Sequence, residues 1–230
     1  VAQLAHSAGG QVIGLDVDPS RLDLLQATIP SARVVNAGSA DVVEQVRQLS
    51  GGHGADVTII CAQGSDPAIA NQAMKMTRKR GKVVIVGIVK MDLERMPFFQ
   101  HELDLRFSRA YGPGCMEPAY ESGRVDYPHS YVRWTQQRNL ASFLELTAQG
   151  RVALEHIIGG VETIEHAQRA YDHLAEGGAG AMLLKYPGAK EADKPRLQLR
   201  PRASVSELLR MGVIGCGNFT RSTHMPNLAS

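Results

Sequence analysis

Short runs rich in β-branched residues alternate with helical patterns over residues 1–90. The runs QVIGLDVD, ARVVNA, ADVTIICA and GKVVIVGI are separated by PSRLDLLQATI, SADVVEQVRQLSGG and SDPAIANQAMKMT. The runs are nearly continuous in Val and Ile, as expected for the strands of a parallel sheet that helices cover on both faces. This alternation of strand and helix predicts a doubly wound α/β domain.

The first ten residues, VAQLAHSAGG, have the composition of a helix that ends at Gly9 and Gly10. Glycine often ends helices because it adopts left-handed backbone conformations without strain. A chain rarely begins inside a helix, so we expect this sequence to be a fragment of a longer protein, inactive alone. Pro19 stands at a first-turn position of the next helix, and Ser39 is the predicted N-cap of the one after it.

The alternation breaks over residues 91–130, which contain prolines and the turn YGPG. Aromatic side chains gather at Tyr111, Tyr120, Tyr127, Tyr131 and Trp134. Two interpretations stay open for this stretch. It is a long loop packed on a neighbouring domain, or a wall of a substrate cleft with Tyr hydroxyls and Arg133 as polar contacts. Both can hold together, and sugar ligands often use such aromatic and polar surfaces.

Asp16 closes the first predicted strand, and Arg21 follows at the start of the next helix. A carboxylate at this edge can accept hydrogen bonds from both ribose hydroxyls of an adenosine, and it repels the 2′-phosphate of NADP. The guanidinium of Arg21 could flank the same ribose or the adenine. The alternative is that Asp16 and Asp18 cap the helix opened by Pro19. The strand–helix–strand context favours ribose binding by Asp16.

Small residues follow the third and fourth predicted strands. Cys61 and Ala62 end one run, and Gly87 and Ile88 end the other. Ligands of doubly wound sheets lie across the carboxyl ends of the strands, where small residues let a dinucleotide approach the backbone. We therefore expect Ala62, Gly87 and Ile88 to line the cofactor cleft. Ordinary loop geometry is the alternative for each of them.

A glycine-rich turn follows the apolar run MGVI near the end of the chain. Gly215 allows a tight turn, and Gly217 lets a pyrophosphate approach the backbone N–H groups of the following helix. Thr220 stands where a third glycine or alanine usually closes the helix onto the strand, so the sequence departs from the common pattern there.

The rest of the chain supplies closing elements and a linker. A long helix ended by Gly150 is expected in VRWTQQRNLASFLELTAQG, then a strand, a helix and a strand in ALEHIIGGV, TIEHAQRAYDHLAEGG and AGAMLLKYP. The predicted domains are a dinucleotide-binding domain with an aromatic loop (1–127), closing helices and strands (128–187), a linker (188–206) and the start of a second dinucleotide-binding domain (207–230).

Composition narrows the classes of partner. A formal charge of +2 over 230 residues gives no reason to expect nucleic acid or a membrane surface as partner, and no apolar run is long enough to span a bilayer. Three separated cysteines fit a reducing compartment, so we expect a cytoplasmic protein. The adjacent pairs His101–Glu102, Glu155–His156 and Glu165–His166 are interpreted as solvated surface pairs, and no metal site is expected in this chain.

Residues 1–187 resemble the C-terminal portion of a zinc-type medium-chain alcohol dehydrogenase. VAQLAHSAGGQVIGLDVDPSRLDLL is similar to that family's first nucleotide-binding helix and second strand, and the spacing from Asp16 to Arg21 matches its acid and following basic residue. RKRGKVVIVGI resembles its fifth sheet strand, and VETIEHAQRAYDHLAEGGAGAMLLKYP its closing helix and strand. The resemblance implies a Rossmann fold, NAD as cofactor in preference to NADP, and zinc bound only by residues before Val1.

Residues 209–228, LRMGVIGCGNFTRSTHMPNL, resemble the opening of the glucose–fructose oxidoreductase and inositol dehydrogenase family, including the H-x-P of His224 and Pro226. The order of the two halves is similar to that of bacterial bi-domain oxidoreductases. The resemblance implies hydride transfer between nicotinamide and a small alcohol or sugar-derived substrate. Gly215 and Gly217 would serve a second cofactor. The catalytic residues of either family are not assigned, and whether the protein is a homo-oligomer stays open.

Two further questions remain at this stage. The family's first strand is central in its sheet, so we expect a slot between the VIGL and VTII strands. Residues 210–214, RMGVI, either fill this slot or begin a separate second domain. The alternative to an enzyme is a non-catalytic module that binds a nucleotide or assembles with partners.

Overall fold

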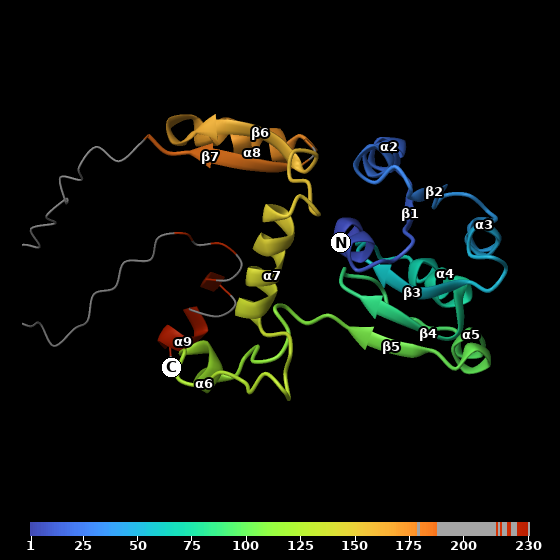
Figure 1. The fold of residues 1–230 in the computed structure, drawn as a ribbon. Coiled ribbons are helices and arrows are strands. Elements are labelled where there is room, and N and C mark those ends of the chain that lie inside the picture. The colour runs from blue at the N-terminus through green and yellow to red at the C-terminus, as the bar shows by residue number, and fades with distance from the viewer. Residues whose placement is uncertain (179, 188–214, 216, 218–219, 222–224, 230) are drawn as a thin grey trace, which may run out of the picture. The chain divides into compact units, whose positions relative to one another are not determined.

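The computed structural model describes residues 1–178, 180–187, 215, 217, 220–221 and 225–229 (Figure 1). Its contacts divide the chain into two compact units, Val1–Tyr186 and Pro187–Ser230. All pairings between strands are parallel in the described part, and helices connect successive strands. The expected α/β class with a parallel, doubly wound arrangement is confirmed.

The elements of the first unit begin with the expected alternation. As far as residue 107 they are α1 (Ala2–Ser7), β1 (Ile13–Asp16), α2 (Pro19–Thr28), β2 (Arg33–Asn36), α3 (Val42–Leu49), β3 (Ala55–Ile60), α4 (Ala68–Met76), β4 (Thr77–Ile85), α5 (Arg95–His101) and β5 (Asp104–Phe107). Then come α6 (Pro118–Glu121), α7 (Gln136–Ala148), β6 (Ile158–Thr163), the 3₁₀ turn η1 (Ile164–His166), α8 (Ala167–Ala175) and β7 (Ala181–Lys185). The second unit contains α9 (Met225–Ala229).

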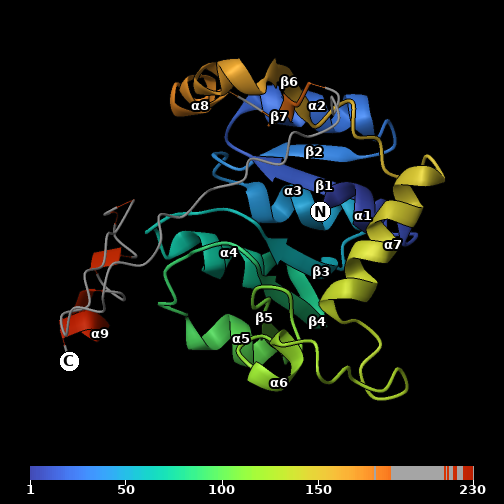
Figure 2. The same ribbon diagram turned by 90° about the vertical axis from the view of Figure 1, so that its left-hand side faces the viewer.

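The strands of residues 1–107 form two separate sheets (Figure 2). β1 pairs with β2, and β3, β4 and β5 form a second sheet in that order. Among the described residues, no hydrogen bond joins β1 to β3, so each of these strands has one unpaired edge. The edge at β3 is partly apolar at the surface, because Val57 and Ile59 are exposed. This arrangement agrees with the expected slot between the two strands.

The main core lies where α4 covers β3 and β4. Ala70, Ala73 and Met74 lie on the buried side of α4, as the spacing of helical neighbours requires. They pack with apolar side chains of the strands into one cluster: Ile60, Ala70, Ala73, Met74, Val83, Ile85 and Leu103. This packing fixes the carboxyl ends of β3 and β4 relative to each other.

The alternation continues further than expected. The sequence predicts a break after residue 90, but α5 and β5 follow, and β5 pairs in parallel with β4. Pro97 lies in the first turn of α5, where a missing N–H costs little. Leu103 joins the core immediately before β5. Pro97 therefore does not interrupt the sheet, and the prediction was wrong for residues 95–107.

Two local predictions also need correction. Asp41, rather than Ser39, occupies the N-cap position of α3, and the Ser39 hydroxyl donates a hydrogen bond to the Asp41 carboxylate. The strand predicted over residues 153–161 begins only at Ile158 and runs to Thr163. Thr163, expected to start a helix, is the N-cap of η1, which leads directly into α8. The long helix that ends before Gly150 is confirmed, with Gly150 in a left-handed conformation (φ 69°).

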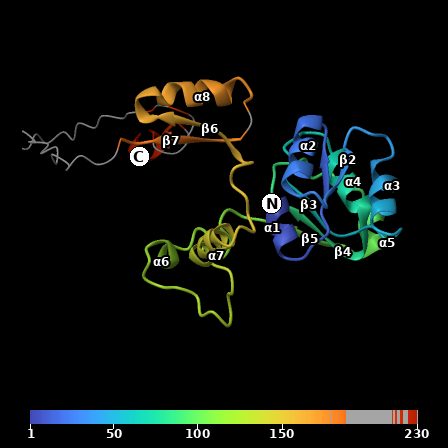
Figure 3. The same cartoon turned by 45° about the horizontal axis from the view of Figure 1, so that its top comes forward.

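The closing elements form a small layer of their own. β6 and β7 pair in parallel, and α8 packs across both strands (Figures 1 and 3). One face of this pair of strands is covered by α8, while Val161 and Leu183 on the opposite face are exposed and stand directly opposite each other in the register. Residues 210–214, predicted as a strand, lie outside the described residues.

Candidate functional site

Asp16 and Arg21 lie together at the carboxyl end of β1. Asp16 is the last residue of that strand, and Arg21 lies in the first turn of α2. Arg21 Nη1 is 3.7 Å from Asp16 Oδ2, and the two side chains are 69% and 31% exposed. The structure thus presents a partly buried carboxylate next to a cation that solvent reaches freely.

Asp18, not Asp16, is the residue that caps α2. Asp18 Oδ1 accepts hydrogen bonds from the backbone N–H and the hydroxyl of Ser20, at 2.9 and 2.7 Å. The Ser20 hydroxyl contributes most, followed by the Ser20 N–H, to holding the pKa of Asp18 below its usual range. Asp16 Oδ1 accepts from the Asp18 N–H at 3.0 Å. That bond orients the Asp16 carboxylate and leaves Oδ2 beside Arg21.

Ala62 and Gly87 approach each other closely beyond the ends of β3 and β4. A Cβ atom on Gly87 would lie 2.0 Å from the Ala62 carbonyl oxygen, so only glycine fits there. The N–H groups of Val86 and Gly87 both donate to the Ile60 carbonyl at 2.9 Å. The structure therefore brings these two predicted residues together, and their contact with a cofactor stays a prediction.

Ile88 lies next to this close approach, and its side chain points largely to solvent. The residue is 73% exposed, and its carbonyl accepts a hydrogen bond from the Gly64 N–H at 2.9 Å. Gly64 also forms an isolated parallel bridge with Val89. An exposed isoleucine on an anchored loop provides an apolar surface that a flat ring could cover.

Asn71 holds the next part of the same loop, and the sequence analysis did not single it out. Its side chain is buried in α4; Nδ2 donates to the Asp92 carbonyl, and Oδ1 accepts from the Glu94 N–H, both at 2.9 Å. The signal that could have found it is an amide on the apolar face of a helix, because buried amides need partners. Asn71 thus fixes the segment that connects β4 to α5.

Gly215 and Gly217 belong to the second unit and are described by themselves. Gly215 has φ of 88°, a conformation that favours glycine. The Thr220 hydroxyl donates to the Gly215 carbonyl at 2.6 Å, and the Arg221 N–H donates to the Gly217 carbonyl at 3.1 Å. Thr220 is buried and closes the turn through this hydrogen bond, where a smaller residue was expected.

The tyrosines of the aromatic stretch are paired with carboxylates that the sequence analysis overlooked. The Tyr111 hydroxyl donates to Glu121, and the Tyr127 hydroxyl donates to Glu117. These bonds to carboxylates raise the pKa of both tyrosines to about 12. The spacing of four residues between Glu117 and Glu121, on one side of α6, is the signal that could have found them.

The other residues of that stretch differ in their surroundings. Tyr131 is almost fully exposed, and the Arg133 guanidinium lies over the Trp134 ring, 4.2 Å from its centroid. Such cation–π stacking engages one face of the indole. The stacking uses the face of the guanidinium and not its N–H donors, so the role of Arg133 as a polar contact stays a prediction.

The part of the chain that the structure describes contains no cluster of side chains arranged as metal ligands. There, no three histidine, cysteine or acidic side chains converge on a point that could hold an ion. These residues therefore do not fit a zinc site, which needs at least three such ligands. His101, expected as part of a solvated pair, is partly buried, and its Nδ1 lies 2.9 Å from the Thr77 carbonyl oxygen. That expectation was wrong for His101.

The described residues at two strand ends have a geometry that is compatible with a dinucleotide. Asp16 has one carboxylate oxygen left for ribose hydroxyls, and its negative charge disfavours a 2′-phosphate. The Gly87–Ala62 approach and the exposed Ile88 lie on the other sheet, beyond the ends of β3 and β4.

The helices of the described residues include none with the length and hydrophobicity of a membrane span.

A model for the family described as zinc-binding dehydrogenase matches residues 1–122 of the chain. A sorbitol dehydrogenase from Halalkalibacterium halodurans is 34% identical over 125 residues, which is 51% of this chain and 35% of that protein. An alcohol dehydrogenase from Rhizobium meliloti is 27% identical over 154 residues, 65% of this chain and 43% of that protein. The chain thus spans less than half the length of these relatives.

Solved structures share the fold at low sequence identity. Alcohol dehydrogenase TADH from Thermus sp. ATN1 matches with a TM-score of 0.61 and 20% identity, over 81% of this chain and 47% of that one. 2R,3R-butanediol dehydrogenase from Bacillus subtilis matches with a TM-score of 0.60 and 16% identity, over 80% and 46%. The family model covers more than half of the chain, and its residues include Asp16, Arg21, Ala62, Gly87 and Ile88. The chain belongs to the zinc-binding dehydrogenase family.

Proposed function

We propose that the protein is an NAD-dependent oxidoreductase that transfers hydride between nicotinamide and an alcohol or sugar-derived substrate. The observation that carries this proposal is the free side of the Asp16 carboxylate. Asp18 takes over the capping of α2, and the Asp18 N–H fixes the orientation of Asp16. A carboxylate held this way at the end of a parallel strand is suited to a ribose diol. The names of the relatives, sorbitol and alcohol dehydrogenase, support the substrate class.

Each described residue has a separate task in this proposal. Asp16 accepts hydrogen bonds from the ribose hydroxyls, while Arg21 stacks against the adenosine and screens the Asp16 charge. Gly87 and Ala62 keep side chains away from the cleft, and Ile88 offers an apolar contact. The bound nicotinamide would supply the hydride donor or acceptor. Zinc would need ligands other than the described residues.

The wider proposal assigns a separate cofactor site to the last residues of the chain. Residues 209–228 begin a second dinucleotide-binding unit of the glucose–fructose oxidoreductase type, with Gly215 and Gly217 near a second cofactor. The protein is then a bi-domain oxidoreductase of sugar metabolism, located in the cytoplasm. The left-handed Gly215 and the hydrogen bond from Thr220 to its carbonyl support a tight turn at this point.

Calorimetric titration with NAD and with NADP tests the cofactor assignment. Asp16→Ala should weaken NAD binding about tenfold or more, because two hydrogen bonds to a charged group are lost. NADP binding should not weaken, since the charge that repels the 2′-phosphate is removed. Asp23→Ala, an exposed acid on the following helix α2, is the matched control and should bind NAD as the unchanged protein does.

The titration tests the ribose assignment, and a measurement of turnover separates the enzyme from the second candidate. Unchanged NAD affinity in Asp16→Ala would remove the ribose assignment. A non-catalytic nucleotide-binding module is the second candidate, and it predicts NAD binding without turnover of any polyol or alcohol by the complete protein. Loss of NADH formation from a substrate that the complete protein otherwise oxidises is the result expected for Asp16→Ala in the enzyme.

A further inference from the structure

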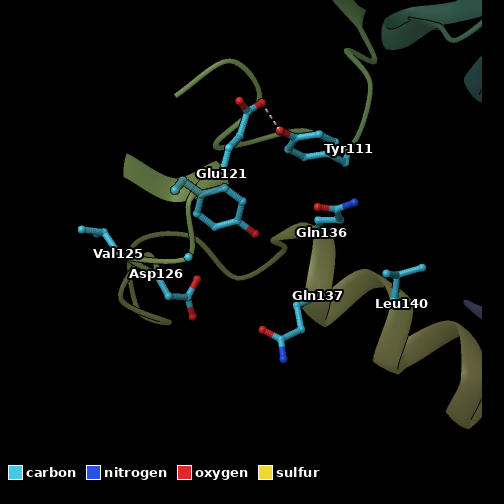
Figure 4. A pocket seen from close by; sticks show the side chains of 9 residues that line it. Tyr111, Glu121, Val125, Asp126, Gln136, Gln137 and Leu140 are labelled. Atoms are coloured by element: carbon cyan, nitrogen blue, oxygen red, sulfur yellow. Dashed lines mark hydrogen bonds between the residues drawn. The ribbon is translucent and has the colours of Figure 1, made fainter. Parts of the chain in front are cut away.

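A pocket of about 550 Å³ lies between the loop after β5 and the beginning of α7 (Figure 4). Its polar and aromatic lining is made by Tyr111, Tyr120, Glu121, Asp126, Gln136 and Gln137. Figure 4 shows the two glutamines and Leu140 projecting from α7, with Val125 and Asp126 on the loop opposite. The volume lies in the range of small-molecule sites.

Stacked tyrosines build the aromatic side of the pocket. The Tyr111 and Tyr120 ring centroids are 6.5 Å apart with an interplanar angle of 27°, and Tyr120 lies 5.4 Å from Tyr127. Gly114 makes this packing possible, because it has φ of 89° and a Cβ there would lie 2.3 Å from the Tyr120 ring. The ring of Tyr120 is therefore held in place by the backbone of the YGPG turn.

Two carboxylates of the lining are fixed by donors of the protein. Glu121 Oε1 accepts from the Tyr111 hydroxyl and, at 2.9 Å, from the Met116 N–H. Asp126 Oδ2 accepts from Arg138 Nη2 at 2.6 Å, and Arg138 also donates to two backbone carbonyls. These bonds orient both acids without a cation inside the lining itself.

Three polar groups of the lining remain free. Within the described residues, the amides of Gln136 and Gln137 and the hydroxyl of Tyr120 make no hydrogen bond. Each amide offers two donors and an acceptor, and the hydroxyl offers one donor. The pocket thus combines ring faces, unused amides and oriented carboxylate oxygens.

We propose that this pocket binds an uncharged carbohydrate ring, outside the cofactor site. A pyranose presents an apolar face of C–H groups that can lie on the tyrosine rings, and a rim of hydroxyls that can donate to the carboxylates and bond to the amides. The charge of Glu121 repels an acidic sugar, and Asp126 adds a smaller repulsion because Arg138 pairs with it. The proposal does not rest on the dehydrogenase assignment, since binding here needs no cofactor.

Binding of methyl β-D-glucopyranoside to the full chain, measured by saturation-transfer NMR and calorimetry, tests the proposal. Saturable binding in the millimolar range is expected. D-glucuronate should bind about fivefold more weakly because of the two carboxylates. Cyclohexanol, which has a ring but a single hydroxyl, should show no saturable binding. None of these three ligands tests the role of Asp16, so a negative result here leaves the outcome of the NAD titration independent.

Variants identify the pocket as the place of binding. The double substitution Gln136→Ala with Gln137→Ala should weaken the glucoside about threefold or more, and Tyr120→Leu should abolish the saturation-transfer signal. Gln149→Ala, an exposed amide at the far end of the same helix, is the control and should bind normally. The glutamines are exposed, so their loss should leave the circular dichroism spectrum unchanged.

Three results would overturn the proposal. They are the absence of saturable glucoside binding at tens of millimolar, equal affinity for glucuronate, and normal binding by the glutamine double variant with an intact spectrum. Equal binding of cyclohexanol would show an apolar crevice and would contradict carbohydrate recognition as well.

Discussion

At the scale of single residues, two buried threonines differ in how their hydroxyls are satisfied. Thr77 Oγ1 donates to the Ala73 carbonyl at 2.6 Å and lies 2.6 Å from Thr58 Oγ1. Thr135 is equally buried, at 1% exposure, but its Oγ1 has no hydrogen-bond partner in the described residues. A buried hydroxyl without a partner loses its hydrogen bonds to water and gains none in the protein. Substitution by valine should therefore destabilise the fold at Thr77 but not at Thr135.

We predict that Thr77→Val lowers the free energy of unfolding by about 1–3 kcal/mol, because it also leaves Thr58 without its partner. Thr135→Val should be neutral or stabilising, since it removes an unsatisfied group and keeps the shape. Urea denaturation followed by circular dichroism measures both changes. Equal destabilisation by the two substitutions would contradict the difference in hydrogen bonding.

The tyrosine–carboxylate pairs lead to a prediction about titration. The Tyr111 hydroxyl, followed by the Met116 N–H, holds the pKa of Glu121 below its usual range. The lowered value means that Glu121 favours the folded state above the carboxyl pKa of the unfolded chain. This contribution is lost as the pH falls through the lowered value in the folded state. The pKa of Tyr111 is instead raised, to about 12. The stability that the Tyr111 hydroxyl contributes is therefore lost only as the pH rises through that value.

Tyr111→Phe should therefore move the Glu121 pKa upward, toward the usual range of a glutamate carboxyl. Carbon-detected NMR titration of the Glu121 carboxyl measures this shift. Tyr131→Phe, at an exposed tyrosine outside the cluster, is the control and should leave the Glu121 pKa in place. An unshifted Glu121 in Tyr111→Phe would show that the hydroxyl does not hold this carboxylate in solution.

At the scale of elements, the loop from β4 to α5 is attached to α4 by two kinds of contact. Asn71 bonds the backbone of Asp92 and Glu94 from a buried position, while Lys75 pairs with the Glu94 carboxylate at 2.9 Å on the surface. Buried hydrogen bonds outweigh exposed ion pairs in such a comparison. Asn71 should therefore dominate the order of this loop.

Hydrogen exchange at the Glu94 amide tests this ranking. Asn71→Leu, similar in size but unable to hydrogen-bond, should expose that amide to faster exchange and destabilise the fold by about 1–3 kcal/mol. Lys75→Ala should change stability by less than about 1 kcal/mol, because both partners are largely solvated. Faster exchange in Lys75→Ala than in Asn71→Leu would reverse the assignment.

Local pattern predicted most elements, and the failures have identifiable causes. The Val-rich and Ile-rich runs marked β1 to β4 because helices bury both faces of a parallel sheet. β5 was missed since DLRF is short and follows a proline-bearing helix, so its place depends on pairing with β4. Asp41 displaced Ser39 as N-cap, although both residue types are suited to it.

The candidate site was predictable to a similar degree. Asp16 and Gly87 were found because strand ends in such sheets lie at one edge. The division of labour between Asp16 and Asp18 required coordinates, because either carboxylate could reach the N–H groups of α2. Local patterns mark Asn71, Glu117 and Glu121 only as unusual positions. Their partners Asp92, Tyr127 and Tyr111 lie ten or more residues away and required coordinates.

At the scale of the whole molecule, residues 1–107 are two half-sheets that carry the predicted cofactor contacts separately. Asp16 and Arg21 lie at the end of β1, and Ala62, Gly87 and Ile88 lie beyond β3 and β4. The covalent connection between the halves runs through β2 and α3, which contacts both β2 and α4. The side chains that would meet opposite ends of one dinucleotide thus depend on how the halves are spaced.

The unpaired edges of β1 and β3 determine that spacing. A strand laid between them and bonded to both would place neighbouring strands about 4.8 Å apart on either side. The width of that one strand would then set the distance from Asp16 to Gly87. The backbone of such a strand would set the spacing of the proposed cofactor contacts, even if none of its side chains touched the cofactor.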